Sequence, residues 1–276
     1  MRRTSFFVSV GAAASFVLAA HAVGAAPKAP GPAKGASKQV VQDALTQLKT
    51  HEPDKVVAAL ETVRPLREEA ASLVPIVHEL LDDGLPPAPA QSAIAFLADV
   101  EASEATSSLI NYTSHRDAGV RRAAAKALGH FKSAAATTTL RRVLGDHDGG
   151  VRGAAASALG AQHARAALPD LVTALDQRVF EAAAAIGQTC DKEECRPLLQ
   201  RLGKLPFDVV TGGLAIVLYR PSADVPEKFK IEVVEHIREL GTIEAHKFLE
   251  DVSKSKGLSK DLKASVDEAV RRTGGS

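Results

Sequence analysis

The sequence lacks tryptophan and has few other aromatic residues. Of its 276 residues only 4% are aromatic, and there are two cysteines and one methionine. A globular core built around large aromatic side chains is therefore not expected. The same shortage argues against a ligand pocket lined by aromatic rings and against a platform for stacking nucleic-acid bases.

Known catalytic motifs are absent as well. The sequence contains no nucleophile elbow, phosphate-binding loop, metalloprotease helix or EF-hand loop, and Gly212-Gly213 is flanked by nothing that would cradle a phosphate. The nine histidines are scattered along the chain. We therefore predict a protein that is not an enzyme, with no metal site and no cofactor.

Alanine, leucine and valine dominate the apolar residues that are present. Hydrophobic residues make up 45% of the chain and charged residues 24%, a balance typical of folded proteins. Alanine is the best helix former and lets neighbouring helices approach closely. The composition thus favours thin helical layers stacked on one another.

The N-terminus has the three-part pattern of a secretory signal. Arg2 and Arg3 precede an apolar run over 6–20, and small residues follow as far as Ala25. The run is shorter than the roughly 20 residues that span a membrane, so we expect cleavage rather than anchoring. Residues 1–25 are predicted to be a signal peptide, and the protein to be exported, either periplasmic or secreted.

The segment after the predicted signal peptide, 26–37 (APKAPGPAKGAS), lacks apolar periodicity and is rich in Pro, Gly and Ala. Such a composition predicts a disordered linker. The folded part is expected to span 38–273, with 274–276 as a short tail. No membrane-spanning segment is expected in the mature chain.

An internal repeat is the strongest structural signal. Residues 117–129 read DAGVRRAAAKALG and residues 148–160 read DGGVRGAAASALG, an offset of 31 residues. A shorter copy, VFEAAAAIG, occupies 179–187, and weaker copies end at Ala98 and Gly241. Helices of a different pattern lie between the copies, so each repeat is a helix pair. Periods of this length indicate a helical array.

The second copy has the features of one amphipathic helix. Asp148 suits an N-cap and Gly160 suits a C-cap. The residues of its apolar face are Val151, Ala154, Ala155, Ala158 and Leu159. A single helix pair cannot bury such a face, whereas stacked pairs can. We predict an all-α fold, a right-handed α-solenoid of about six to seven helix pairs.

These copies resemble the second helix of HEAT repeats, especially the short repeats of phycobiliprotein lyases. The resemblance is clearest over 99–201. In HEAT families an acid before the second helix and an Arg within it form a ladder between successive repeats. The resemblance places this ladder at Asp146 and Arg152, with Arg121 as the preceding rung. The pattern fails at His115 and Phe180, so the ladder is expected to be partial.

Two His-Glu pairs suggest an enzymatic alternative. His51-Glu52 and His78-Glu79 resemble the pairs with which deoxyhypusine hydroxylase, a HEAT-repeat enzyme, holds two irons. In that family the pairs follow the Arg-like position of the second helix, where this chain has Arg-Ala and Gly-Ala instead. The resemblance to lyases implies a second alternative, the handling of a tetrapyrrole. Solvated pairs on a binding scaffold are the simpler interpretation.

Cys190 and Cys195 are separated by four residues, in a predicted turn between two helices. In an oxidising compartment such a pair is expected to form a disulfide. Closing so short a loop stabilises by about 2 kcal/mol, so the bond would fix the turn locally. A zinc site would need two more ligands nearby, and a redox role would favour two intervening residues.

Charge is distributed unevenly along the chain. Residues 52–104 contain 11 acidic and 3 basic residues, whereas 115–165 contain 9 basic and 3 acidic ones. We predict a partly basic inner surface, lined by second helices, that binds a protein partner, with an acidic partner favoured by the charge. Its residues would be Arg122, Lys126, Arg141 and Arg142. The alternative is an ordinary solvated face. Nucleic acid is not expected, because the net charge is only +1.

The last segment, 258–273, places Leu262, Val266 and Val270 on one helical face. Solenoids need a terminal helix with a polar outer side, and this segment fits that description. A helix lying on an anionic membrane is the alternative. Together the observations predict a non-catalytic, exported HEAT-like scaffold that mediates protein–protein interaction.

Overall fold

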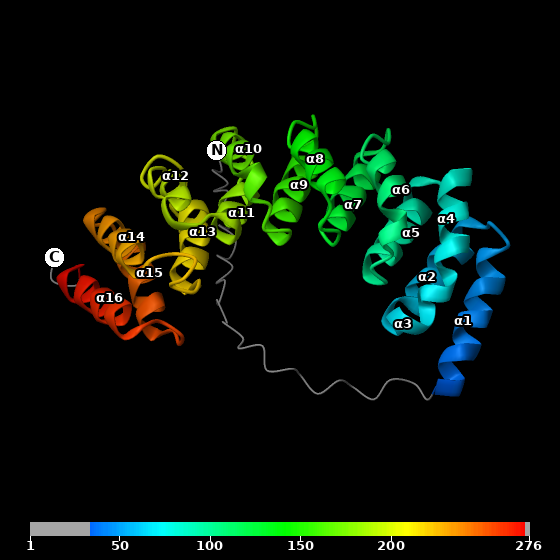
Figure 1. The fold of residues 1–276 in the computed structure, drawn as a ribbon, viewed down its shortest axis with the longest axis horizontal. Helices are drawn as coiled ribbons and strands as arrows, with labels where there is room; N and C mark the ends of the chain where they lie inside the picture. Colours follow the sequence, from blue (N-terminus) through cyan, green and yellow to red (C-terminus); the bar gives the residue numbers. More distant parts are fainter. Residues whose placement is uncertain (1–33, 274–276) are drawn as a thin grey trace, which may run out of the picture.

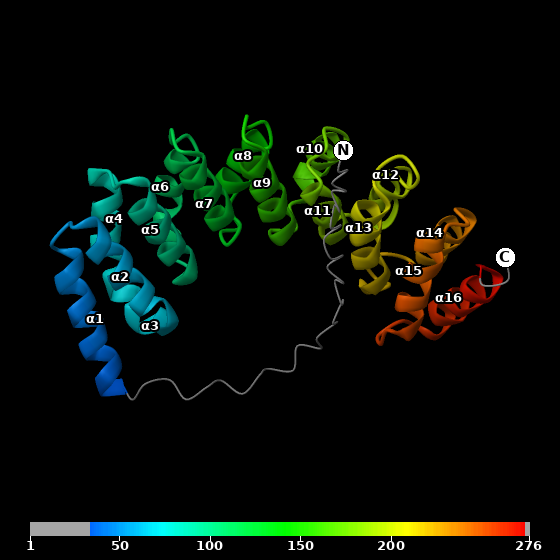
Figure 2. The same ribbon diagram turned by 180° about the vertical axis from the view of Figure 1, so that it is seen from behind.

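The computed structural model describes residues 34–273, which form a single curved array of helices (Figures 1 and 2). Within this range every regular element is a helix, in agreement with the predicted all-α fold. The first eight α-helices are α1 (Lys34–Leu48), α2 (Pro53–Val63), α3 (Arg67–Ala70), α4 (Val74–Asp83), α5 (Pro87–Asp99), α6 (Thr106–Tyr112), α7 (Ala118–Leu128) and α8 (Ala134–Val143).

The remaining α-helices complete the array. They are α9 (Gly149–Ala161), α10 (Leu168–Asp176), α11 (Glu181–Thr189), α12 (Arg196–Leu199), α13 (Phe207–Tyr219), α14 (Glu227–Glu239), α15 (Ile243–Lys254) and α16 (Lys260–Thr273). Short 3-10 helices occupy several joints: η1 (Arg64–Leu66), η2 (Ala71–Leu73), η3 (Ser103–Ala105), η4 (Arg165–Ala167) and η5 (Lys192–Cys195).

From α4 to α13 the helices alternate between two layers. Helices α5, α7, α9, α11 and α13 pack on one another in succession, and they lie on the concave side of the arc (Figure 1). Helices α4, α6, α8, α10 and α12 lie on the convex side, as the view from behind also shows (Figure 2). We call these the inner and outer layers. The two clear sequence copies form α7 and α9, so the repeat signal belongs to the inner layer.

Equivalent aspartates begin the two repeat helices. The side chains of Asp117 and Asp148 accept hydrogen bonds from the backbone N–H groups of Val120 and Val151, at 3.0 and 2.9 Å. Each carboxylate therefore satisfies one of the amide groups that a helix start leaves without a partner. The predicted N-cap at Asp148 is confirmed.

The predicted C-cap at Gly160 is wrong. Helix α9 continues to Ala161, and a Cβ built on Gly160 would lie 2.8 Å from Cα of Ala185 in α11. The same constraint recurs one helix further on, where a Cβ on Gly187 would collide with the backbone oxygen of Gly213 in α13. These glycines serve close helix approach rather than a turn, which local sequence cannot distinguish.

At the N-terminal end the folded part begins earlier than predicted. Helix α1 starts at Lys34, inside the segment 26–37 that was predicted to be a linker. The predicted signal peptide (1–25), the rest of that linker and the tail at 274–276 lie outside the described residues. None of the described helices is long and apolar enough to cross a membrane.

Three helices form the C-terminal end of the array. Helix α16 packs on α14 and α15, and buries Leu262, Val266 and Ala269. Its charged residues lie on the remaining face, with Arg271 and Arg272 paired to Glu268 of the same helix. A helix with one buried and one polar face fits the predicted role of closing the solenoid.

Candidate binding surface

On the concave side, α7 presents two of the predicted basic residues. Arg122 and Lys126 are both exposed and lie one turn apart, whereas Ala124 and Ala125 between them are buried. Arg122 makes a loose ion pair, with Nη2 3.6 Å from Oδ1 of Asp148. Within the described part of the chain Lys126 has no ion pair. These two cations are therefore available to a ligand on the inner surface.

Helix α9 has glycines at two positions where side chains of the neighbouring inner helices contact it. A Cβ built on Gly150 would lie 2.7 Å from Nη2 of Arg122, and one built on Gly153 would lie 2.5 Å from Oε1 of Glu181. The Arg122 side chain from α7 and the Glu181 side chain from α11 thus lie against α9. The inner surface is basic at α7 and acidic at α11, and Gly153 of α9 between them is buried.

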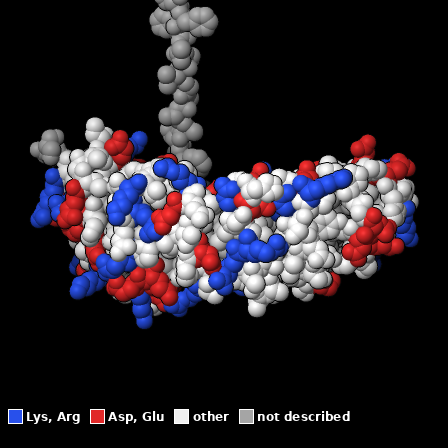
Figure 3. Space-filling view, turned by 90° about the horizontal axis from the view of Figure 1, so that it is seen from above, with Lys and Arg blue, Asp and Glu red and all other residues white. Residues whose placement is uncertain are grey.

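Two of the four predicted basic residues do not reach the inner surface. Arg141 and Arg142 lie on α8, in the outer layer, where Nε of Arg141 is 2.5 Å from Oδ2 of Asp170 and Nη2 of Arg142 donates to Oγ1 of Thr113 at 3.0 Å. The four predicted basic residues therefore lie on two different faces. They come from one basic stretch of sequence, but its consecutive helices α7 and α8 belong to opposite layers. On the outer face basic and acidic side chains lie next to one another (Figure 3).

The predicted ladder residues do come together, but with different partners. Arg121 of α7 donates from Nε and Nη2 to both oxygens of Asp146, at 2.8 and 2.9 Å. Arg152 reaches only backbone oxygens, those of Asp146 and His147. Gln177 stands 31 residues after Asp146, so the next repeat offers Arg152 no carboxylate at that position. The one ladder contact between successive repeats among these residues is Arg121–Asp146, and Arg152 contacts Asp146 only through its backbone oxygen.

His115 holds, one repeat earlier, the position that Asp146 holds in its own repeat, and it makes one of the same contacts. Its Nδ1 accepts a hydrogen bond from the backbone N–H of Asp117, as Oδ1 of Asp146 does from that of Asp148. No arginine precedes it on α5, where Ala90 stands 31 residues before Arg121. The departure at His115 therefore preserves the turn and loses the ion pair between repeats.

The contact between Arg121 and Asp146 shifts the pKa of both side chains. The hydrogen bond from Arg121 lowers the pKa of the Asp146 carboxyl below its ordinary value. The same hydrogen bond raises the pKa of the Arg121 guanidinium against the opposing effect of burial. Both groups are charged throughout the physiological range, and neither is poised to transfer a proton. The rung is a structural contact.

Neither His-Glu pair belongs to a group of side chains that could hold a metal ion in the described residues. His51 follows α1 with a left-handed backbone, and its Nδ1 is 3.9 Å from Oδ2 of Asp83. His78 on α4 contacts Ser108 through Nε2 at 2.9 Å and Asp82 through Nδ1 at 3.1 Å. In residues 34–273 no group of three or more His, Cys, Asp or Glu side chains is arranged to hold a metal ion.

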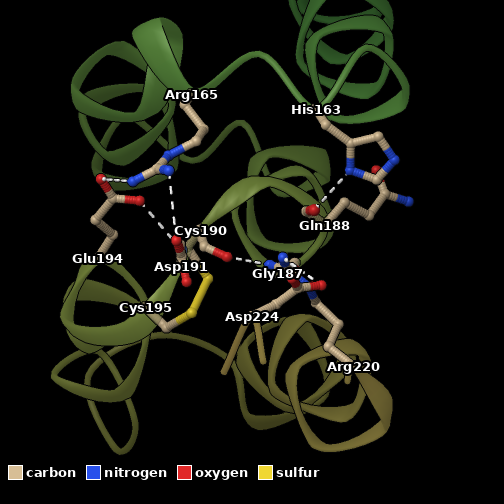
Figure 4. Close-up of a disulfide and its surroundings, with 10 residues drawn as sticks. All are labelled: His163, Arg165, Gly187, Gln188, Cys190, Asp191, Glu194, Cys195, Arg220 and Asp224. Atoms are coloured by element: carbon tan, nitrogen blue, oxygen red, sulfur yellow. Dashed lines mark hydrogen bonds and ion pairs between the residues drawn. A yellow bond between two sulfur atoms is a disulfide. The ribbon is translucent and has the colours of Figure 1, made fainter. Parts of the chain in front are cut away.

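A disulfide joins Cys190 to Cys195 (Figure 4). Cys190 follows the last residue of α11, Cys195 ends η5, and both are fully buried. Residues of the neighbouring repeats meet the turn that the bond closes. Arg165 contacts Asp191 and Glu194 within it, at 3.3 and 2.8 Å.

Arg220, which follows α13, approaches the same turn from the other side (Figure 4). Its Nη1 donates to the backbone oxygen of Cys190, and Nη2 lies 3.4 Å from Oδ2 of Asp224. The disulfide turn therefore contacts the repeats on both sides, which the local role predicted for it did not include. No local pattern could show this, since the arginines are 25 or more residues from the cysteines in the sequence.

The fold and these contacts define the class of protein, an α-solenoid of stacked helix pairs. A sequence model of HEAT repeats matches residues 74–160 and 106–180. The chain therefore contains HEAT repeats, as the repeat copies predicted. No curated protein sequence matches it.

A solved structure shows the same kind of fold. A structure of the complex of CpcE and CpcF of phycocyanin lyase from Nostoc sp. PCC7120 matches at 18% identity, with a TM-score of 0.51, over 91% of this chain and 99% of the matched chain. Two further matches, with TM-scores of 0.37 and 0.38, are an engineered protein and a designed armadillo repeat protein in complex with the peptide (KR)4. The engineered protein shares 16% identity and covers 87% of this chain and 96% of its own. The armadillo repeat protein shares 18% identity and covers 86% of this chain and 98% of its own.

Proposed function

We propose that this protein is an exported, non-catalytic scaffold that binds a protein partner along its inner surface. The observation that carries the proposal is the pair of exposed cations on α7, Arg122 and Lys126. Repeat solenoids present extended concave surfaces of this kind to their ligands. An acidic segment of the partner would cross α7 at these residues.

The geometry favours a carboxylate at Arg122. A guanidinium binds a carboxylate through two parallel hydrogen bonds, and its present contact with Asp148 is long and partly solvated. Exchanging that contact for a partner's carboxylate would cost little.

Two independent features support the export of this protein. The first is the signal-like pattern of residues 1–25, with Arg2 and Arg3 ahead of an apolar run. The second is the disulfide between Cys190 and Cys195, because such bonds persist mainly in oxidising compartments. Fractionation of the producing cell, with the mature N-terminus read by mass spectrometry, tests it. A cytoplasmic chain that still begins at Met1 would contradict it.

Charge reversal tests the binding surface. The variant Arg122→Glu/Lys126→Glu should lose partners that the parent captures by crosslinking in the cell envelope. The variant Arg141→Glu/Arg142→Glu makes the same change of charge in the outer layer, and it should retain them. Equal capture by both variants would show that the basic side of the inner surface does not bind the partner.

A second candidate function is the handling of a tetrapyrrole or a metal. The likeness to the phycocyanin lyase complex, which extends over 91% of this chain, favours it as an alternative. An absorption spectrum and a metal analysis of the purified mature protein distinguish the two. Bound pigment, or iron in stoichiometric amount, would replace the scaffold proposal.

A further inference from the structure

Three neighbouring inner helices carry different residues at one equivalent position of the repeat. The residue two places after the first valine of each sequence copy is Arg122 in α7, Gly153 in α9 and Glu181 in α11. A cation, a residue without a side chain and an anion therefore follow one another across the inner layer.

Both charged side chains extend toward α9, which packs between α7 and α11. Nη2 of Arg122 lies 2.7 Å from the Cβ position of Gly150, and Oε1 of Glu181 lies 2.5 Å from that of Gly153. These glycines are three residues apart, so they share one face of α9, with about 5–6 Å between their Cβ positions. The guanidinium and the carboxylate therefore lie over neighbouring points of one helix.

These two charges do not neutralise each other, and both are accessible. The one ion pair of Arg122 in residues 34–273 is its loose contact with Asp148, whose carboxylate already caps α9. In the same residues the Glu181 side chain has neither an ion pair nor a hydrogen bond. The Arg122 side chain is 45% exposed, and Glu181 is exposed as well. A ligand on the inner surface can thus reach both groups.

A ligand of a single sign fits this arrangement poorly. A carboxylate placed at Arg122 and Lys126 is attracted to α7, but a second carboxylate placed toward α11 meets Glu181. Like charges brought together across an interface are unfavourable, whereas a basic group at Glu181 gains a second ion pair. The charges of the surface therefore favour a ligand that carries both signs close together.

We propose that the partner segment bound here is extended and carries an acidic and a basic side chain two residues apart. The acidic side chain pairs with Arg122 and the basic one with Glu181. This inference rests on the proposed function, because it specifies the chemistry of the segment that crosses α7. Residues two apart in an extended chain point to the same side and lie about 6–7 Å apart, which suits the spacing over α9.

Three fluorescent peptides of equal length test the proposal with the purified full chain. The first repeats Glu-Ser-Lys-Ser three times, the second has Glu in place of each Lys, and the third has Lys in place of each Glu. In anisotropy titrations at low ionic strength the mixed peptide should bind about threefold or more tighter than either of the others. Equal or tighter binding of the acidic peptide overturns this inference but leaves the basic surface on α7 as a binding site.

Variants of single exposed residues then assign the preference. Glu181→Lys should reverse it, so that the acidic peptide binds more tightly than the mixed one. The matched control is Glu79→Lys, which makes the same change of charge at an exposed residue without an ion pair on α4, in the outer layer. It should leave the order of the peptides unchanged. An unchanged order in Glu181→Lys, or a reversed one in Glu79→Lys, overturns the inference.

The variant Arg122→Glu separates this inference from the proposed function. It should weaken the binding of the acidic peptide and of the mixed peptide, because both place a carboxylate at α7. If the acidic peptide binds this variant as tightly as it binds the parent, the proposed basic surface itself is wrong.

Discussion

Arg121 of α7 and Asp146, which precedes α9, form a two-point ion pair between successive repeats. Their side chains are 5% and 11% exposed, so the pair is almost completely removed from water. Breaking such a pair leaves a buried charge without a partner. We expect Asp146→Asn to lower the free energy of unfolding by about 3 kcal/mol, measured by chemical denaturation.

The matched control for that variant is Asp170→Asn. It breaks the pair between Arg141 and Asp170, which also joins neighbouring repeats but is 43% and 38% exposed. Solvent screens an exposed pair, so the expected loss is less than about 1 kcal/mol. Equal losses in the two variants would show that burial does not decide the strength of these contacts.

The same pair predicts a dependence of stability on pH. Because Arg121 lowers the pKa of Asp146 in the folded state, the pair's contribution is fully present above the unfolded pKa of about 3.9. It is lost as the pH falls through the folded value. The stability difference between the parent and Asp146→Asn should therefore shrink between pH 7 and pH 2 in denaturant titrations. A constant difference would contradict the assignment.

Two adjacent glycines in α13 should respond in opposite directions to alanine. A Cβ on Gly213 would collide with the backbone oxygen of Ala183 in α11, whereas one on Gly212 would meet nothing within 4 Å. Gly213→Ala should destabilise by about 1–3 kcal/mol through overpacking. Gly212→Ala should stabilise by about 0.5–1 kcal/mol, because alanine favours the helix. Thermal melts of both variants test the close approach of α11 and α13.

The disulfide should be closed in the native protein and protected from reductant. Cys190 and Cys195 are fully buried, and the loop between them is short. Cys190→Ala/Cys195→Ala should lower the free energy of unfolding by about 2 kcal/mol. Alkylation in denaturant without reductant, followed by mass spectrometry, should label neither cysteine in the parent. Labelling of both would show that the bond does not form.

Much of the fold could be predicted from the sequence, because the relevant signals are local. The capping of α9 by Asp148 depends on residues three positions apart, and the helix faces depend on residues within two turns. Gly160 was misassigned because a glycine that ends a helix and a glycine that lets two helices touch look the same in one sequence. Only the neighbouring Ala185 distinguishes them.

The binding surface was predicted only in part, for a similar reason. A basic block in the sequence does not reveal which helices share a layer, so Arg141 was grouped with Arg122 although their helices lie on opposite sides. The ladder was placed on the right residues, and Arg121 makes the predicted contact with the next repeat, whereas Arg152 finds no carboxylate there. The contacts of Arg165 and Arg220 with the disulfide turn had no local signal, because both arginines come from neighbouring repeats.

Site-specific photocrosslinking tests the central claim most directly. A photoreactive residue at position 126, on the inner layer, or at position 141, on the outer layer, is activated in the intact cell envelope. The proposed scaffold predicts a discrete crosslinked partner from position 126 and none from position 141. Crosslinking from position 141 alone would contradict binding along the inner surface.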